Sequence, residues 1–138
     1  MQTDQGQATP SRYAAFSLPQ PLHAANEGLA FLLELVMLAG LAWWGSQAVA
    51  GLAGRIALAV LTPALAVVIW GLFAAPRARV QLPMAGVLAV KTIVFGGATV
   101  AVYAMGWHVP AIAFAIVAAV NMTVAAFDRQ ALVRQERG

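Results

Sequence analysis

The strongest constraint on this chain is a series of four apolar stretches, each long enough to cross a lipid bilayer. A hydrocarbon core of about 30 Å requires roughly 20 apolar residues in a helix that rises 1.5 Å per residue. Residues 28–50, 55–75, 84–106 and 109–127 meet that length. Of the 138 residues 62% are hydrophobic and only 9% are charged, which excludes disorder for most of the chain. The sequence therefore predicts an all-α, polytopic integral membrane protein.

Short connections between the stretches predict how neighbouring helices run. The first stretch is joined to the second, and the third to the fourth, by a few residues, which makes neighbours antiparallel. We therefore expect two antiparallel hairpins packed as a four-helix transmembrane domain over residues 27–128. Residues 1–26 show no helical or strand period and are expected to form a flexible tail. Residues 129–138 are expected to form a short basic tail.

The distribution of Lys and Arg predicts the orientation in the membrane. The two tails and the connection between the second and third stretches carry six arginines, whereas the opposite side carries Arg55 at most. Because cytoplasmic loops hold the excess of positive charge, we expect a multi-pass protein of the bacterial cytoplasmic membrane with both termini in the cytoplasm. Arg77, Arg79 and Arg129 are expected to anchor at lipid headgroups. This pattern explains the net charge of +3 without a nucleic-acid partner.

Four polar side chains lie within the apolar stretches at a similar predicted depth. Glu34, Lys91, Asn121 and Trp70 are each six or seven residues, about 10 Å, inside the cytoplasmic end of their stretch. On insertion scales a charge at the centre of a membrane helix costs about 2.5–3.5 kcal/mol. The sequence therefore predicts a Glu34–Lys91 ion pair, with the Asn121 amide and the Trp70 N–H as further partners.

Two interpretations of this polar layer stay open. In the first, the ion pair fixes helix register, and the protein is a non-enzymatic structural or regulatory membrane component. In the second, Glu34 binds a proton, an ion or a small ligand in a transporter or channel. The second interpretation requires a homo-oligomer, because four short helices hardly enclose a pathway. The small multidrug resistance transporters are an analogy for it, but their Glu faces no cation such as Lys91.

Catalytic chemistry has little support in the sequence. His23 and His108 fall on opposite sides of the predicted membrane, so they cannot share a metal ion, and each is expected to be solvated. The absence of cysteine excludes disulfides and cysteine-ligated metals. We therefore expect no enzyme activity, no cofactor and no metal site.

Two local patterns concern helix packing. Pro63 removes one backbone hydrogen bond inside the second stretch and predicts a mild kink, with the Thr62 hydroxyl satisfying the freed carbonyl. Gly96 and Gly97 are followed by Ala101 at helical spacing. Small residues at this spacing predict a smooth face for close helix contact.

Two motifs carry a resemblance to a known family. Residues 70–78 read Trp-Gly-Leu-Phe-Ala-Ala-Pro-Arg-Ala, and residues 31–35 read Phe-Leu-Leu-Glu-Leu, which alone is a weak signal. Further matching positions are Asn26, Trp44, Gly45, Val94, Phe95, Gly96, Gly106 and Asn121. Over about residues 26–125 the chain resembles the YrdB-like family of small bacterial four-helix membrane proteins, whose function is unknown.

The resemblance implies four transmembrane helices and no particular activity. The chain departs from the family pattern at Ala30, where members often have Arg, and at Lys91, where they usually have Glu. Both signs of charge are nevertheless kept between the first and third helices. This retention favours a structural role for the polar layer and weakens any mechanism that needs two carboxylates.

Overall fold

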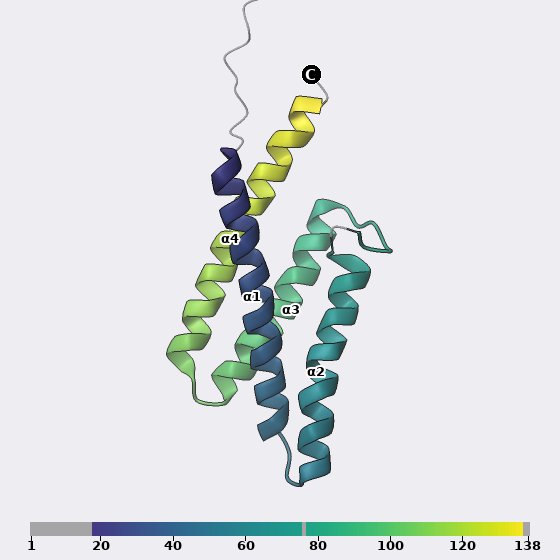
Figure 1. The fold of residues 1–138 in the computed structure, drawn as a ribbon, viewed down its shortest axis with the longest axis vertical. Coiled ribbons are helices and arrows are strands. Elements are labelled where there is room, and N and C mark those ends of the chain that lie inside the picture. The colour runs from purple at the N-terminus through teal and green to yellow at the C-terminus, as the bar shows by residue number, and fades with distance from the viewer. Residues whose placement is uncertain (1–17, 76, 137–138) are drawn as a thin grey trace, which may run out of the picture.

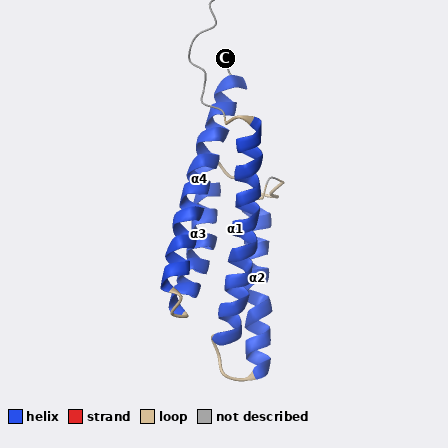
Figure 2. Ribbon diagram, turned by 60° about the vertical axis from the view of Figure 1, so that its left-hand side comes forward, coloured by secondary structure: helices blue, strands red, loops and turns tan. Residues whose placement is uncertain are grey.

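The computed structural model of the chain describes residues 18–75 and 77–136, with side chains as far as residue 131. All regular structure in these ranges is helical (Figure 2). The four helices are α1 (Gln20–Gln47), α2 (Leu52–Phe73), α3 (Met84–Ala104) and α4 (His108–Glu136). Each contains a segment long and apolar enough to cross a membrane. The predicted all-α fold with four membrane-spanning helices is confirmed.

The helices form two antiparallel hairpins, α1–α2 and α3–α4, which pack against each other as a bundle (Figures 1 and 2). Within the described ranges, α1 and α3 each contact the three other helices, whereas α2 and α4 do not contact each other. The central pair is therefore α1 and α3, with α2 and α4 beside it. We call the end where α1 begins and α4 finishes the terminal end, and the opposite end the hairpin end.

The core of the bundle is small and apolar. Leu33 and Met37 of α1 pack in one cluster with Phe95 and Ala98 of α3. Phe95 also stacks on Phe114 of α4, with ring centroids 5.7 Å apart. Large apolar side chains cover much of the outer surface, including Phe31, Val60, Leu61, Ile93, Val100, Val109 and Phe127. An apolar outer surface of this extent is typical of helices that face lipid.

Two helices are longer than the predicted spans. Residues 20–26, expected in the N-terminal tail, form the first turns of α1, and most of the predicted basic tail is the end of α4. Both ends run past the α2–α3 connection and lie side by side (Figure 1). Pro21 in the first turn of α1 fits this start, because proline needs no backbone partner there. Residues 1–17 lie outside the described residues.

α1 and α2 approach each other closely near the hairpin end. A Cβ atom on Gly45 would overlap the backbone carbonyl of Leu58 in α2. The Thr62 hydroxyl lies 2.9 Å from the carbonyl oxygen of Leu41 in α1 and 2.8 Å from that of Leu58. Thr62 therefore links the two helices. Pro63 frees the backbone carbonyl of Ala59, and the Thr62 hydroxyl does not bond to that carbonyl.

The glycine face of α3 is not used for packing within the chain. Gly96 and Gly97 are exposed, and a Cβ atom at either position would meet nothing within 4 Å. The small residues of α3 that are buried are Ala98 and Ala101. The prediction of close helix contact at the glycines is therefore wrong for the single chain, because this face of α3 points away from its neighbours.

Candidate functional site

Polar side chains of α1 and α4 meet at the terminal end. The Asn121 amide donates to the Asn26 side-chain oxygen at 2.8 Å and to the Asn26 backbone carbonyl at 3.0 Å. Farther along, His23 Nδ1 lies 2.6 Å from Asp128 Oδ2. His23 Nε2 lies 3.2 Å from Glu27 Oε1. Asn121 and Asp128 are the two buried polar residues among those whose side chains are described.

Helical spacing explains why these contacts form. Asn121 and Asp128 are seven residues apart on α4, which is two turns, so both side chains face the same way. His23 and Asn26 are three residues apart on α1 and also share a face. Because α1 and α4 cross this region side by side, the two faces meet in two successive polar contacts.

His23 is the residue whose role differs most from the sequence expectation. It was expected to be a solvated residue of the tail, but it is half-buried between two carboxylates, one from each helix. Each ring nitrogen lies within 3.2 Å of a carboxylate oxygen. Asp128 also accepts a hydrogen bond from the backbone N–H of Leu18 at 3.2 Å. The spacing of His23 and Glu27, four residues apart on one helix face, was the available signal.

The four residues of the predicted polar layer do not all lie together: Asn121 is separated from the other members. Asn121 contacts Asn26, which lies eight residues, about 12 Å, before Glu34 along α1. The structure therefore does not place Asn121 beside Glu34. Trp70 lies close to the Glu34 carboxyl, but its buried Nε1 makes no hydrogen bond to any described residue.

Glu34 of α1 and Lys91 of α3 lie on the central helix pair, and the structure shows no salt bridge between them. Both side chains are half-buried. Among the described side chains, however, the only salt bridges are those of His23 with its two carboxylates. The Glu34–Lys91 ion pair therefore stays a prediction.

A cavity of about 260 Å³ with both polar and apolar lining residues opens beside the α1–α4 contacts at the terminal end. Five titratable side chains line it: His23, Glu27, Lys91, Asp128 and Arg129. A second cavity of about 240 Å³ lies under the α2–α3 connection and is lined in part by Arg77 and Arg129. Neither cavity has Glu34 in its lining. Of the predicted headgroup anchors, Arg77 and Arg129 thus line a cavity, whereas Arg79 is exposed and lines neither.

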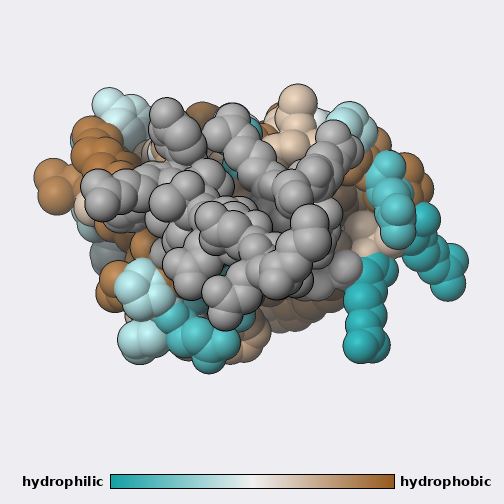
Figure 3. Space-filling view, turned by 90° about the horizontal axis from the view of Figure 1, so that it is seen from above, coloured by the Kyte–Doolittle hydropathy of each residue, from teal (hydrophilic) through white to brown (hydrophobic). Residues whose placement is uncertain are grey.

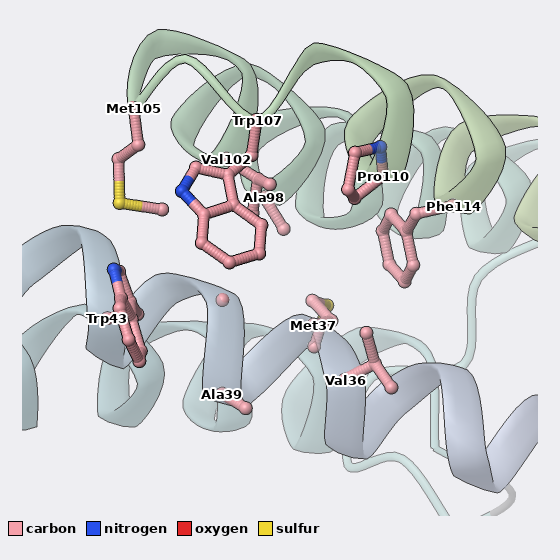
Figure 4. Close-up of a pocket in the computed structure, with 11 residues that line it drawn as sticks. Val36, Met37, Ala39, Trp43, Ala98, Val102, Met105, Trp107, Pro110 and Phe114 are labelled. Carbon is pink, nitrogen blue, oxygen red and sulfur yellow. The ribbon is translucent and has the colours of Figure 1, made fainter.

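A third cavity, of about 290 Å³, lies nearer the hairpin end between α1 and the α3–α4 hairpin (Figure 4). Its lining is almost entirely apolar. Trp43 of α1 and Trp107 of the α3–α4 connection both line it and contact each other, with ring centroids 6.2 Å apart (Figure 4). Met37 and Phe114 line its inner part. This cavity offers apolar contact and no charged group.

The titratable residues at the terminal end do not form a metal site. No group of three or more His, Cys, Asp or Glu side chains within the described ranges is arranged to hold a metal ion. The chemistry offered there is ionic contact and hydrogen bonding.

Comparison with known proteins gives one match. Residues 28–119 match the family described as protein of unknown function DUF2568. Neither the curated proteins nor the solved structures gave a match. The matched segment includes Glu34, Trp70 and Lys91, whereas His23 and Asp128 lie outside it. Because the match covers two thirds of the chain, this four-helix protein belongs to the DUF2568 family, whose function is unknown.

Proposed function

We propose that this protein is a non-enzymatic structural or regulatory component of the bacterial cytoplasmic membrane, with both termini in the cytoplasm. The observation that carries the proposal is that the two buried polar residues of the described part of the chain connect α4 to α1. Asn121 and Asp128 both contact α1, so their polar groups hold two helices together. The arginines near the terminal end support a cytoplasmic location for that end. We include in this proposal that the chain is a YrdB-like protein, which the match to the DUF2568 family does not specify.

Glu34 and Lys91 have a structural role in the same proposal. They lie on α1 and α3, the two helices that contact all the others in the described ranges. Attraction between their opposite charges favours the packing of this central pair. Removing one of the two leaves the other without compensation in a membrane environment, where an unpaired charge is costly.

The test is thermal unfolding of the purified protein in detergent. We expect Glu34→Gln and Lys91→Met each to lower the Tm, and the double variant to recover most of the loss, because no charge is then stranded. Thr92→Val is the matched control on α3, because Thr92 is exposed and its hydroxyl bonds only within its own helix. If both single variants melt at or above the wild-type temperature, the charges do not stabilise the bundle and the structural role fails.

A second candidate is an oligomeric transporter or channel in which Glu34 binds a proton or an ion. The supporting observation is that Glu34 is half-buried and has no salt bridge among the described side chains. This candidate predicts proton or cation flux in proteoliposomes that Glu34→Gln abolishes. Under the structural proposal, vesicles with wild-type protein and vesicles with Glu34→Gln have the same leak as vesicles without protein.

A further inference from the structure

The two cavities at the terminal end, of about 260 and 240 Å³, are adjacent. They share Ala74, Val87 and Arg129 in their linings. Cations from three separate elements surround them: Lys91 from α3, Arg129 from α4 and Arg77 from the α2–α3 connection. We propose that these three cations form a discrete binding site for the headgroup of an anionic phospholipid.

The charges in the cavities favour an anion. Both acidic side chains of the lining, Glu27 and Asp128, are engaged by His23. Asp128 accepts a further hydrogen bond from the backbone. Lys91 attracts Glu34 in the proposed structural role but forms no salt bridge with it, and Arg129 likewise forms none with any side chain that the structure describes. The N–H groups of Lys91 and Arg129 are therefore available to a phosphate group. Phosphate binds strongly to Arg and Lys through charge-assisted hydrogen bonds.

The position and lining of the cavities favour a lipid as the source of that phosphate. Lys91 lies seven residues, about 10 Å, beyond the first residue of α3, and its long side chain lines the cavity at the terminal end. The same lining contains Met84, Leu88 and Met122. A free anion gains nothing from these apolar side chains, whereas the glycerol and first acyl carbons of a phospholipid pack against them. Basic pockets between membrane helices are typical sites for anionic headgroups.

The rim of the terminal end carries both polar and apolar side chains. Figure 3, which looks down on the terminal end, shows hydrophilic side chains at its rim next to apolar side chains on the flanks. A phospholipid needs this combination, because its headgroup is polar and its chains are apolar.

The site differs from general attraction between arginines and the membrane surface. Arg79 lies on the same α2–α3 connection as Arg77 and is also exposed, but it lines neither cavity. Surface attraction predicts that both arginines contribute alike. A discrete site predicts that only Arg77 contributes.

The experiment is a lipid titration of the full-length protein in detergent, measured by native mass spectrometry. We expect phosphatidylglycerol to bind in preference to phosphatidylcholine. Arg129→Gln and Arg77→Gln should each weaken phosphatidylglycerol binding about five-fold, as should Lys91→Gln. Lys91→Arg keeps the charge and should retain binding, and Arg79→Gln should bind as the wild type does. Circular dichroism checks that each variant remains helical.

Three results would overturn the proposal. Equal binding of the two lipids would remove the preference for an anion. An equal loss in Arg79→Gln and Arg77→Gln would show surface attraction without a discrete site. Displacement of phosphatidylglycerol by inorganic phosphate at a similar concentration would identify a free anion as the ligand.

Discussion

Asn121 is a single residue at which polar contact can be separated from packing. Leu has a similar volume but no amide, so Asn121→Leu removes both bonds to Asn26 while filling the same space. Hydrogen bonds between membrane helices contribute about 0.6–2 kcal/mol, so we expect thermal unfolding in detergent at a Tm lower by a few degrees. Thr123→Val is the control on α4, because its hydroxyl bonds only to the carbonyl of Ala119. Equal Tm values for the two variants would mean that the amide contributes nothing.

The sequence predicts which residues are unusual better than it predicts their partners. Counting residues along a helix gives the depth of Asn121 and Lys91, but it does not give the rotation of each helix about its axis or the angle at which helices cross. Predicted depth alone places Asn121 near Glu34, whereas in the structure Asn121 bonds to Asn26. Asn26 was missed as a partner because an apolar-span criterion assigned it to the tail.

At the scale of helices, the close approach of α1 and α2 depends on Gly45. A Cβ atom there would overlap the backbone of Leu58, which cannot move without moving α2. We expect Gly45→Ala to destabilise the protein by about 1–3 kcal/mol in detergent unfolding, as overpacking does in other proteins. Gly96→Ala is the matched control, because its Cβ atom would meet no neighbour. It should be neutral or slightly stabilising, since Ala is the better helix former. A stable Gly45→Ala variant would show that the two helices can separate at little cost.

Helix boundaries were predictable where helices end at the edge of their apolar stretch. α2 and α3 begin and end within three residues of the predicted spans. α1 and α4 continue beyond theirs, because their polar ends support each other through His23 and Asp128. A hydropathy criterion counts apolar residues only. It cannot detect a helix that is stabilised outside the membrane by contacts with a distant part of the chain.

At the scale of the whole molecule, the fold class followed from the sequence because few arrangements satisfy four apolar helices with short connections. The choice of α1 and α3 as the central pair did not follow from it. Any of several helix orders around the bundle satisfies the same connections, and only side-chain packing selects between them. Glu34 and Lys91 lie on these two helices, which have the most neighbours. Their charges can therefore affect the packing of the whole bundle.

The proposed topology makes a prediction for the whole chain in its native membrane. The chain contains no cysteine, so a single introduced cysteine reports its own location. Ala50 at the hairpin end and Gln130 at the terminal end are both exposed, which makes Ala50→Cys and Gln130→Cys a matched pair. We expect a membrane-impermeant maleimide to label Ala50→Cys in intact cells and Gln130→Cys only after permeabilisation, because the arginines of the terminal end favour the cytoplasm. The reverse pattern would place both termini outside. It would also place the proposed headgroup site in the outer leaflet.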